Sequence, residues 1–111
     1  MAVSWSLTDT AQFDPGRCAA FLRAYQEIDA LITPTSPIPA FRLGEKSDPL
    51  AMYLCDIYTI PTNLAGHPAM SVPFGNGAHG MPIGIQVLAP ALGEQAMFRV
   101  GGALETARAG K

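Results

Sequence analysis

The residue types of a nucleophilic site are present in the sequence, but they are scattered. Cys55, Asp56 and His67 are the types that a thiol hydrolase needs. Cys55 lies in a predicted apolar helix and His67 precedes a proline, so we favour an inert cysteine and a capping or exposed histidine. None of the five serines lies in GxSxG or has a glycine neighbour, and the two lysines are Lys46, in a predicted loop, and Lys111, the last residue. A serine nucleophile activated by a base is therefore not predicted within this sequence.

Two other kinds of site are also disfavoured. His67 and His79 lack the HxH, HxxxH or CxxC spacing that a metal site requires. The glycines at 75, 77 and 80 lack GxGxxG and the lysine of a phosphate-binding loop, and a strand is predicted to follow them. The sequence thus predicts no metal site and no cofactor, and the glycine-rich segment is interpreted as a turn between two strands.

Asp56 is the acid that lies inside an apolar helical stripe, beside Leu54 and Ile57. A carboxylate buried there needs a hydrogen bond or a cation. In one interpretation it caps a helix that restarts near residues 59–61. In the other it faces a pocket and holds a cationic or amine group of a ligand through a charge-assisted hydrogen bond. The residues alone leave both interpretations open.

Composition limits the class of protein. The chain has 111 residues, of which 49% are hydrophobic and 14% charged. A chain of this length buries roughly two-thirds of its unfolded surface, and the low charge predicts surface that is covered by more polypeptide. A net charge of −2 with seven scattered basic residues disfavours direct nucleic-acid binding.

Cys18 and Cys55 lack CxxC spacing, and no signal peptide or membrane span is found, so a cytoplasmic protein is expected.

Hydrophobic periodicity predicts an α/β protein. The predicted elements are a helix over 14–27, a buried strand over 30–33, an irregular segment over 34–47, a helix over 49–65 that is kinked or restarted at Pro61, strands over 69–73 and 82–90, and a helix over 94–108. Three strands are few for an independent α/β domain, so further sheet is expected from another chain or from residues outside this sequence.

Local signals within these elements predict caps and buried faces. The helices are expected to begin at Asp14, at Ser47 or Asp48, and again at Thr59, and Gly66 is expected to be a left-handed cap. The glycine pair at 101–102 costs about 1 kcal/mol per residue in a helix, which close packing must require. The predicted buried stripe of the second helix consists of Leu50, Tyr53, Leu54, Ile57 and Tyr58.

Several motifs together resemble one family. They are TPT at 33–35, FRLGEKSDPLAMYLCDI at 41–57, TIPTNLAGHPAMSVP at 59–73, PIGIQVLAP at 82–90 and the helix after Glu94. In this combination the chain resembles the C-terminal segment of the amidase signature family. Within that family it is most similar to the A subunits of the glutamyl-tRNA(Gln)/aspartyl-tRNA(Asn) amidotransferases. The resemblance covers residues 17–108.

The resemblance implies a fold and an activity. The fold is α/β with a large mixed sheet, and the activity is a glutaminase whose Ser-Ser-Lys apparatus releases ammonia for transamidation of mischarged tRNA. It implies that Asp56 binds the amino group of glutamine and that Asn63 and Gly66 belong to the pocket wall. The implied partners are glutamine and the other amidotransferase subunits, with tRNA only indirectly and no membrane. The Ser-Ser-Lys signature does not occur in these 111 residues, so the chain alone is expected to be inactive.

Residues 1–13 do not match the resemblance. They are expected to be a flexible leader before an amidase-like segment over 14–111, and the mismatch suggests a truncated gene, a frame-shifted remnant or a deliberately shortened chain. Two alternatives in function remain. One is a non-catalytic interaction module that docks its apolar surface on another protein, and the other is the remnant of a general small-molecule amidase.

Overall fold

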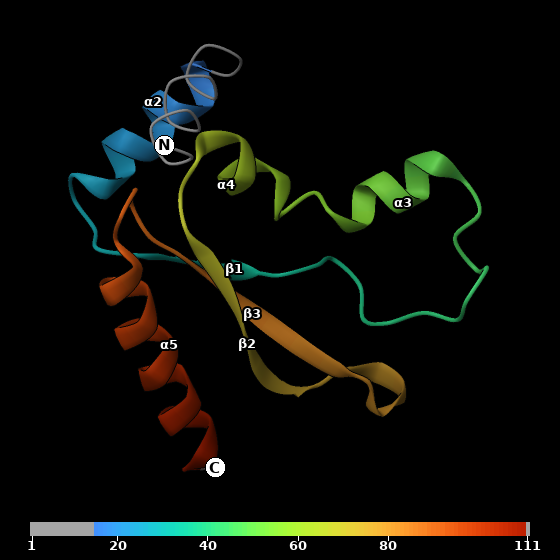
Figure 1. Ribbon diagram of the computed structural model, residues 1–111. Helices are drawn as coiled ribbons and strands as arrows, with labels where there is room; N and C mark the ends of the chain where they lie inside the picture. The colour runs from blue at the N-terminus through green and yellow to red at the C-terminus, as the bar shows by residue number, and fades with distance from the viewer. Residues whose placement is uncertain (1–14, 111) are drawn as a thin grey trace.

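The structure is a computed structural model that describes the backbone of residues 15–110 and the side chains of residues 19–110. The predicted leader, the cap at Asp14 and the side chain of Cys18 lie outside these limits. The elements in chain order (Figure 1) are α2 (Pro15–Tyr25), β1 (Leu31–Pro34), α3 (Pro49–Cys55), α4 (Ile60–Ala65), β2 (Ala69–Asn76), the 3-10 turn η1 (Ala78–Gly80), β3 (Pro82–Leu88) and α5 (Glu94–Ala109).

The three strands form one antiparallel sheet in the order β1-β3-β2. The prediction of a hairpin around the glycine-rich turn is confirmed, because β2 pairs with β3 on either side of η1. The register places Thr33 of β1 and Ser71 of β2 opposite Gln86 of the central strand. The mixed helix and sheet content confirms the predicted class, and residues 35–48 are irregular as expected.

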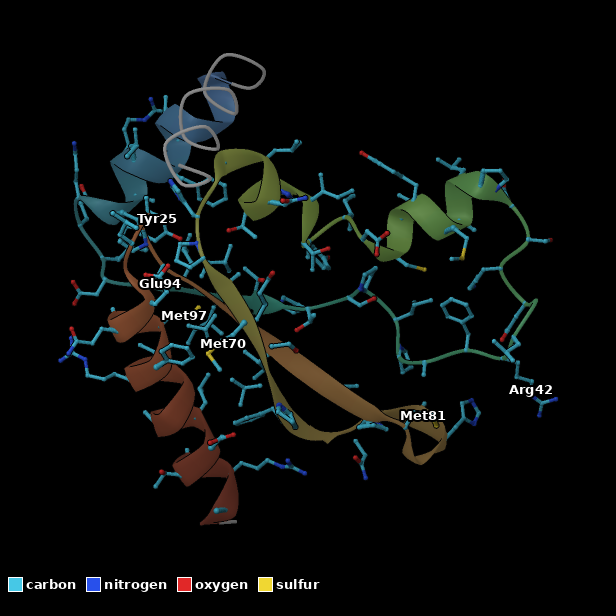
Figure 2. The ribbon with its side chains drawn as sticks, in the orientation of Figure 1. Tyr25, Arg42, Met70, Met81, Glu94 and Met97 are labelled. Carbon is cyan, nitrogen blue, oxygen red and sulfur yellow. The ribbon has the colours of Figure 1, made fainter. Side chains whose placement is uncertain are left out.

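The hydrophobic core lies between α5 and one face of the hairpin. Its buried members are Val72, Val87, Ala89 and Met97, against which Met70 and other apolar side chains pack. Figure 2 shows Met70 and Met97 between β2 and α5. Burying an aliphatic side chain of this size stabilises a fold by about 1.5–3 kcal/mol. This cluster is therefore the main source of stability among the described residues.

The glycine pair of α5 has one member at the core and one outside it. A Cβ at Gly101 would lie 3.1 Å from Met70 Sδ and 3.4 Å from Val72 Cγ2, whereas a Cβ at Gly102 would meet nothing within 4 Å. Gly101 is itself buried. The expectation that close packing requires a glycine is thus confirmed for the first of the two.

Two of the predicted caps have the expected geometry. Asp48 Oδ1 accepts a hydrogen bond from Leu50 N at 3.3 Å and caps α3, while Gly66 ends α4 in the left-handed region with φ 76°. Thr59 occupies the N-cap position of α4, but its hydroxyl donates to the Asp56 carbonyl oxygen at 3.1 Å and makes no cap hydrogen bond. The turn at 56–59 separates α3 from α4, and Pro61 lies in the first turn of α4. Of the predicted kink or restart, the structure has the restart.

The predicted burial of two elements is wrong. No residue of α3 is buried, and Leu50 and Tyr53 are 62% and 56% exposed. The reason is that α3 extends away from the sheet (Figure 1). In β1 the burial alternates, and Ile32 is 52% exposed because α5 packs over β2 and β3 and not over this edge strand. An apolar helix exposed on all sides is typical of a helix that is buried in a larger body.

The packing of α5 predicts opposite effects for the two glycines. Gly101→Leu should lower the free energy of unfolding by about 1–3 kcal/mol, because the added atoms overfill the contact with Met70 and Val72. Gly102→Leu should raise it by up to about 1 kcal/mol, because it gains helix propensity in open space. Urea unfolding followed by circular dichroism measures both, and equal effects of the two substitutions would contradict this arrangement.

Candidate functional site

Polar groups gather on the sheet face opposite to α5. Met70 and Val72 contact α5, and because successive side chains of a strand point to opposite faces, Ser71 points the other way. Its cross-strand neighbour Gln86 shares that face, as does Thr33 on the far side of Gln86. The turn between α3 and α4 lies over this face, because Gln86 Nε2 donates to the Tyr58 carbonyl oxygen at 2.9 Å.

A cavity of about 360 Å³ opens between this face and α4. Its walls carry hydroxyls, amides and one imidazole, which can donate or accept hydrogen bonds. The polar lining residues are Thr35, Thr59, Thr62, Asn63, His67, Ser71 and Gln86. Because most of the accessible lining is apolar, the cavity suits a small ligand with an apolar part and a few hydrogen-bonding groups.

A hydroxyl pair lies at the rim of this cavity. Thr35 Oγ1 and Ser71 Oγ are 2.7 Å apart. Gly84 of β3 makes room for them, since a Cβ there would overlap Ser71 Oγ and lie 3.2 Å from Thr35 Oγ1. No histidine or lysine among residues 19–110 is hydrogen-bonded to either hydroxyl. Within the described residues, the pair therefore offers hydrogen bonds to a ligand.

Asp56, Asn63 and Gly66, the three predicted site residues, do not all lie at the cavity. Asn63 lines the cavity, whereas Asp56 and Gly66 do not. Asp56 is the C-cap of α3, and its carbonyl oxygen accepts hydrogen bonds from Thr59 N at 3.0 Å and from Ile60 N at 3.1 Å. Gly66 is the left-handed residue that ends α4, directly before His67. The structure therefore brings Asn63 to the cavity and places Asp56 on the adjoining turn.

The expected burial of Asp56 is wrong, because its side chain is exposed. Within the described residues, no hydrogen bond or ion pair reaches its carboxylate. Thr59 occupies the N-cap position of α4, so the Asp56 side chain does not cap the restarted helix. The interpretation of Asp56 as the cap of α4 is therefore not met. The interpretation in which its carboxylate is available to a ligand stays open.

The cysteine and histidine that a thiol hydrolase would need do not lie together as a catalytic pair. Cys55 Sγ donates a hydrogen bond to the Ala51 carbonyl oxygen at 3.3 Å. His67 instead packs against Phe21 and Tyr25 of α2, with ring centroids 5.7 Å and 5.6 Å away. The cysteine is thus tied to its own helix, as the sequence favoured.

Burial perturbs two groups in this aromatic cluster. Tyr25 Oη and His67 Nδ1 are buried without a hydrogen-bond partner among the described residues. Desolvation disfavours the charged form of each group. It lowers the pKa of His67 below its usual value and raises the pKa of Tyr25 to about 12.

A second concave region, of about 550 Å³, lies between the segment 38–46 and the tip of the hairpin. Arg42 and His79 on its border are exposed, and Figure 2 shows Arg42 at the outer edge of the molecule. Lys46 Nζ lies 5.7 Å from the centroid of the Phe41 ring. This region is larger than the cavity beside α4, but no buried hydrogen bond joins its polar side chains among the described residues. The cavity beside α4 is lined by Gln86, which is 3% exposed and makes two side-chain hydrogen bonds. The cavity beside α4 is therefore the better candidate.

The polar row formed by Thr33, Gln86 and Ser71 was not predicted from the sequence. The available signal was a polar residue in each predicted strand, with Thr33 at the end of 30–33 and Ser71 and Gln86 inside 69–73 and 82–90. Nothing local shows that three such residues share one face and one level, because that depends on the register of the strands.

Among the described side chains, those of residues 19–110, no group of three or more His, Cys, Asp or Glu residues is arranged to hold a metal ion. No helix in this part of the chain has the length and apolar character to cross a bilayer.

Comparison with known proteins gives a consistent set of relatives. The amidase family profile matches residues 11–98. The A subunit of glutamyl-tRNA(Gln) amidotransferase from Nocardia farcinica is 59% identical over 90 residues, which cover 79% of this chain and 18% of the relative. Its counterpart from Acidobacterium capsulatum is 58% identical over 87 residues.

Solved structures agree with these relatives. The A subunit of glutamyl-tRNA(Gln) amidotransferase from Thermotoga maritima matches with a TM-score of 0.70 and 46% identity over 74% of this chain and 18% of that chain. A 6-aminohexanoate cyclic dimer hydrolase matches with a TM-score of 0.68 and 29% identity over 82% and 22%. The matched part of the chain spans 18% of the length of the Nocardia farcinica relative.

The lowered pKa of His67 predicts a pH-dependent stability. Because the folded-state pKa lies below the unfolded value of about 6.5, neutral His67 favours the folded state. The contribution of neutral His67 to the free energy of unfolding is therefore complete above about pH 6.5 and is lost as pH drops toward the folded-state pKa. Over this range the unfolding constant rises by at most about tenfold for each pH unit. Urea midpoints at pH 7, 6 and 5 should show this loss, and His67→Phe should reduce it.

Exposed His79 supplies the control for this measurement. The variant His79→Phe should keep the pH dependence of the unsubstituted chain. An unchanged pH dependence in His67→Phe would show that protonation of this imidazole is not coupled to folding.

Proposed function

The chain belongs to the amidase family, and from that premise we propose that it forms one wall of the glutamine pocket in the A subunit of a glutamine-hydrolysing amidotransferase. In this proposal the assembled enzyme is cytoplasmic and releases ammonia for the transamidation of mischarged Glu-tRNA(Gln) or Asp-tRNA(Asn). The nucleophilic serine and its base come from polypeptide beyond the 111 residues. The chain itself supplies binding groups and part of the hydrophobic core.

The observation that carries the proposal is the 59% identity to the Nocardia farcinica relative. The solved structures favour the same substrate class, since identity is 46% to the Thermotoga maritima amidotransferase chain and 29% to the cyclic dimer hydrolase. Both values come with similar TM-scores of 0.70 and 0.68, so the fold alone does not distinguish them. This difference in identity supports an amidotransferase over a general small-molecule amidase.

The chemistry of the cavity region fits an amino acid ligand. Asp56 is an exposed carboxylate without a partner among the described residues, and it can accept charge-assisted hydrogen bonds from an ammonium group. Asn63 and the hydroxyls of Thr35 and Ser71 can bond the remaining polar groups of glutamine. The chain therefore contributes recognition of the substrate, while bond cleavage is assigned to the rest of the enzyme.

The shape of the chain supports its place in a larger body. Its radius of gyration is 15.5 Å, against about 13 Å for a compact domain of this length. The apolar helix α3 has no buried residue, and Leu54 is 45% exposed. The same apolar surface is the observation that favours the second candidate, a non-catalytic module that docks on another protein.

Substitution of Asp56 tests the substrate role. In a chimera, residues 17–108 replace the matching segment of the Nocardia farcinica relative, which is assembled with its own partner subunits. Asp56→Ala should raise KM for glutamine by about 10- to 100-fold, the effect of losing a hydrogen bond to a charged group. The control Glu105→Ala removes an exposed acid on α5 and should leave KM unchanged. If both variants keep the KM of the chimera, Asp56 does not bind the substrate amine.

The isolated 111-residue chain separates the two candidates. We expect no release of ammonia from glutamine, because no serine among the described residues has a base within reach. We also expect binding of a hydrophobic dye and a broad thermal transition, because α3 is uncovered. A monodisperse chain with a sharp, cooperative transition would favour the interaction module instead. Turnover that survives replacement of all five serines would contradict the proposed function.

A further inference from the structure

We propose that Gln86 is a positioning residue, whose side-chain amide fixes the turn at 56–59 and thereby the direction of Asp56. The functional meaning of this inference rests on the proposed function of Asp56, but the positioning itself does not. Gln86 is only 3% exposed, and its Nε2 donates to Thr33 Oγ1 and to the Tyr58 carbonyl oxygen, both at 2.9 Å. One side chain thus joins the central strand to the edge strand and to the turn.

The two partners of Gln86 require a group with two donors. The Tyr58 carbonyl oxygen can only accept a hydrogen bond. Thr33 Oγ1 gives its own proton to the Pro34 carbonyl oxygen at 3.0 Å, so it too accepts from Gln86. A primary amide supplies two N–H groups from one nitrogen, which also fixes its orientation. An ionised carboxylate supplies none, and an aliphatic side chain leaves two partly buried acceptors unpaired.

The backbone of Gln86 is firmly held, because β3 is paired on both sides. Thr33 lies opposite it on β1 and Ser71 on β2. The next residue, Val87, is fully buried in the core with α5. Because the backbone of Gln86 is fixed, its side-chain amide can hold the groups that it binds in one place.

The turn at 56–59 has few other ties to the rest of the fold. Its backbone hydrogen bonds are local, such as Asp56 N to the Tyr53 carbonyl oxygen at 3.0 Å. Ile57 and Tyr58 are 42% and 40% exposed, so apolar packing holds the turn only weakly. Among the described residues, Gln86 makes the hydrogen bond that links this turn to the sheet. A second tie, from Ser36 Oγ to the Cys55 carbonyl oxygen at 3.1 Å, reaches only the irregular segment.

The consequence concerns Asp56. Its carboxylate has no partner among the described residues that would hold it in one direction. Its orientation therefore depends on the backbone of the turn, which Gln86 holds two residues away. Loss of the amide should leave the sheet intact and release the turn.

Amide hydrogen exchange of the assembled chimera, which contains residues 17–108, tests this directly. In Gln86→Met, which keeps length and removes both donors, the amides of Thr59 and Ile60 should exchange at least about tenfold faster. The amides of Val72 and Met97 in the core should change less than about threefold. Gln86→Glu, which matches the shape but lacks donors, should give the same pattern. Ser71→Ala is the control in the same polar row, and it should leave exchange at Thr59 unchanged.

Three outcomes would overturn the proposal. They are unchanged exchange at Thr59 in the Gln86 variants, equal acceleration in the turn and the core, and equal acceleration in Ser71→Ala. Unfolding of both Gln86 variants would appear as equal acceleration throughout, so it also counts against a positioning role.

A second measurement connects the turn to the substrate. In the chimera, Gln86→Met should raise KM for glutamine, and it should add nothing further when Asp56 is already alanine. An additive effect would show that Gln86 does not act through Asp56. If Asp56→Ala leaves KM unchanged while exchange at Thr59 still responds to Gln86→Met, the proposed function fails and the positioning role stands.

Discussion

The close contact of α5 with the β2–β3 hairpin is the constraint on which the rest of the structure depends. It buries Val72, Val87 and Met97, and Gly101 allows the helix to approach the strand. The contact fixes which face of the hairpin is apolar. The opposite face is then left to Gln86 and Ser71, and the cavity forms there. The polar site is thus a consequence of where the apolar core lies.

Features set by local physics could be predicted from the sequence. A proline after an acid marks the start of α3, and Gly66 adopts the left-handed conformation that ends α4. The hairpin follows from a glycine-rich segment between two apolar runs. Each of these depends on a few neighbouring residues, so the periodicity and the turn residues are sufficient to find them.

Features set by distant contacts could not be predicted in the same way. The apolar stripe of α3 indicates that the helix is buried somewhere, but not that its partner is missing from these residues. The role of Gln86 depends on the register of three strands and on a carbonyl group 28 residues away. The resemblance implies roles for Asp56 and Asn63 but not for this amide, since a motif does not show which side chains hold a turn in place.

The length of α3 has a consequence for how the chain becomes ordered. It has seven residues, one Asp48 cap and no buried side chain. Isolated helices shorter than about 12–15 residues are marginal in water, because nucleation costs more than a few hydrogen bonds return. In the larger enzyme proposed above, most of the free energy that keeps this segment helical would come from a surface that covers Leu50 and Tyr53. The helix–coil equilibrium of α3 would then be coupled to assembly, and its helicity would report whether that enzyme is in place.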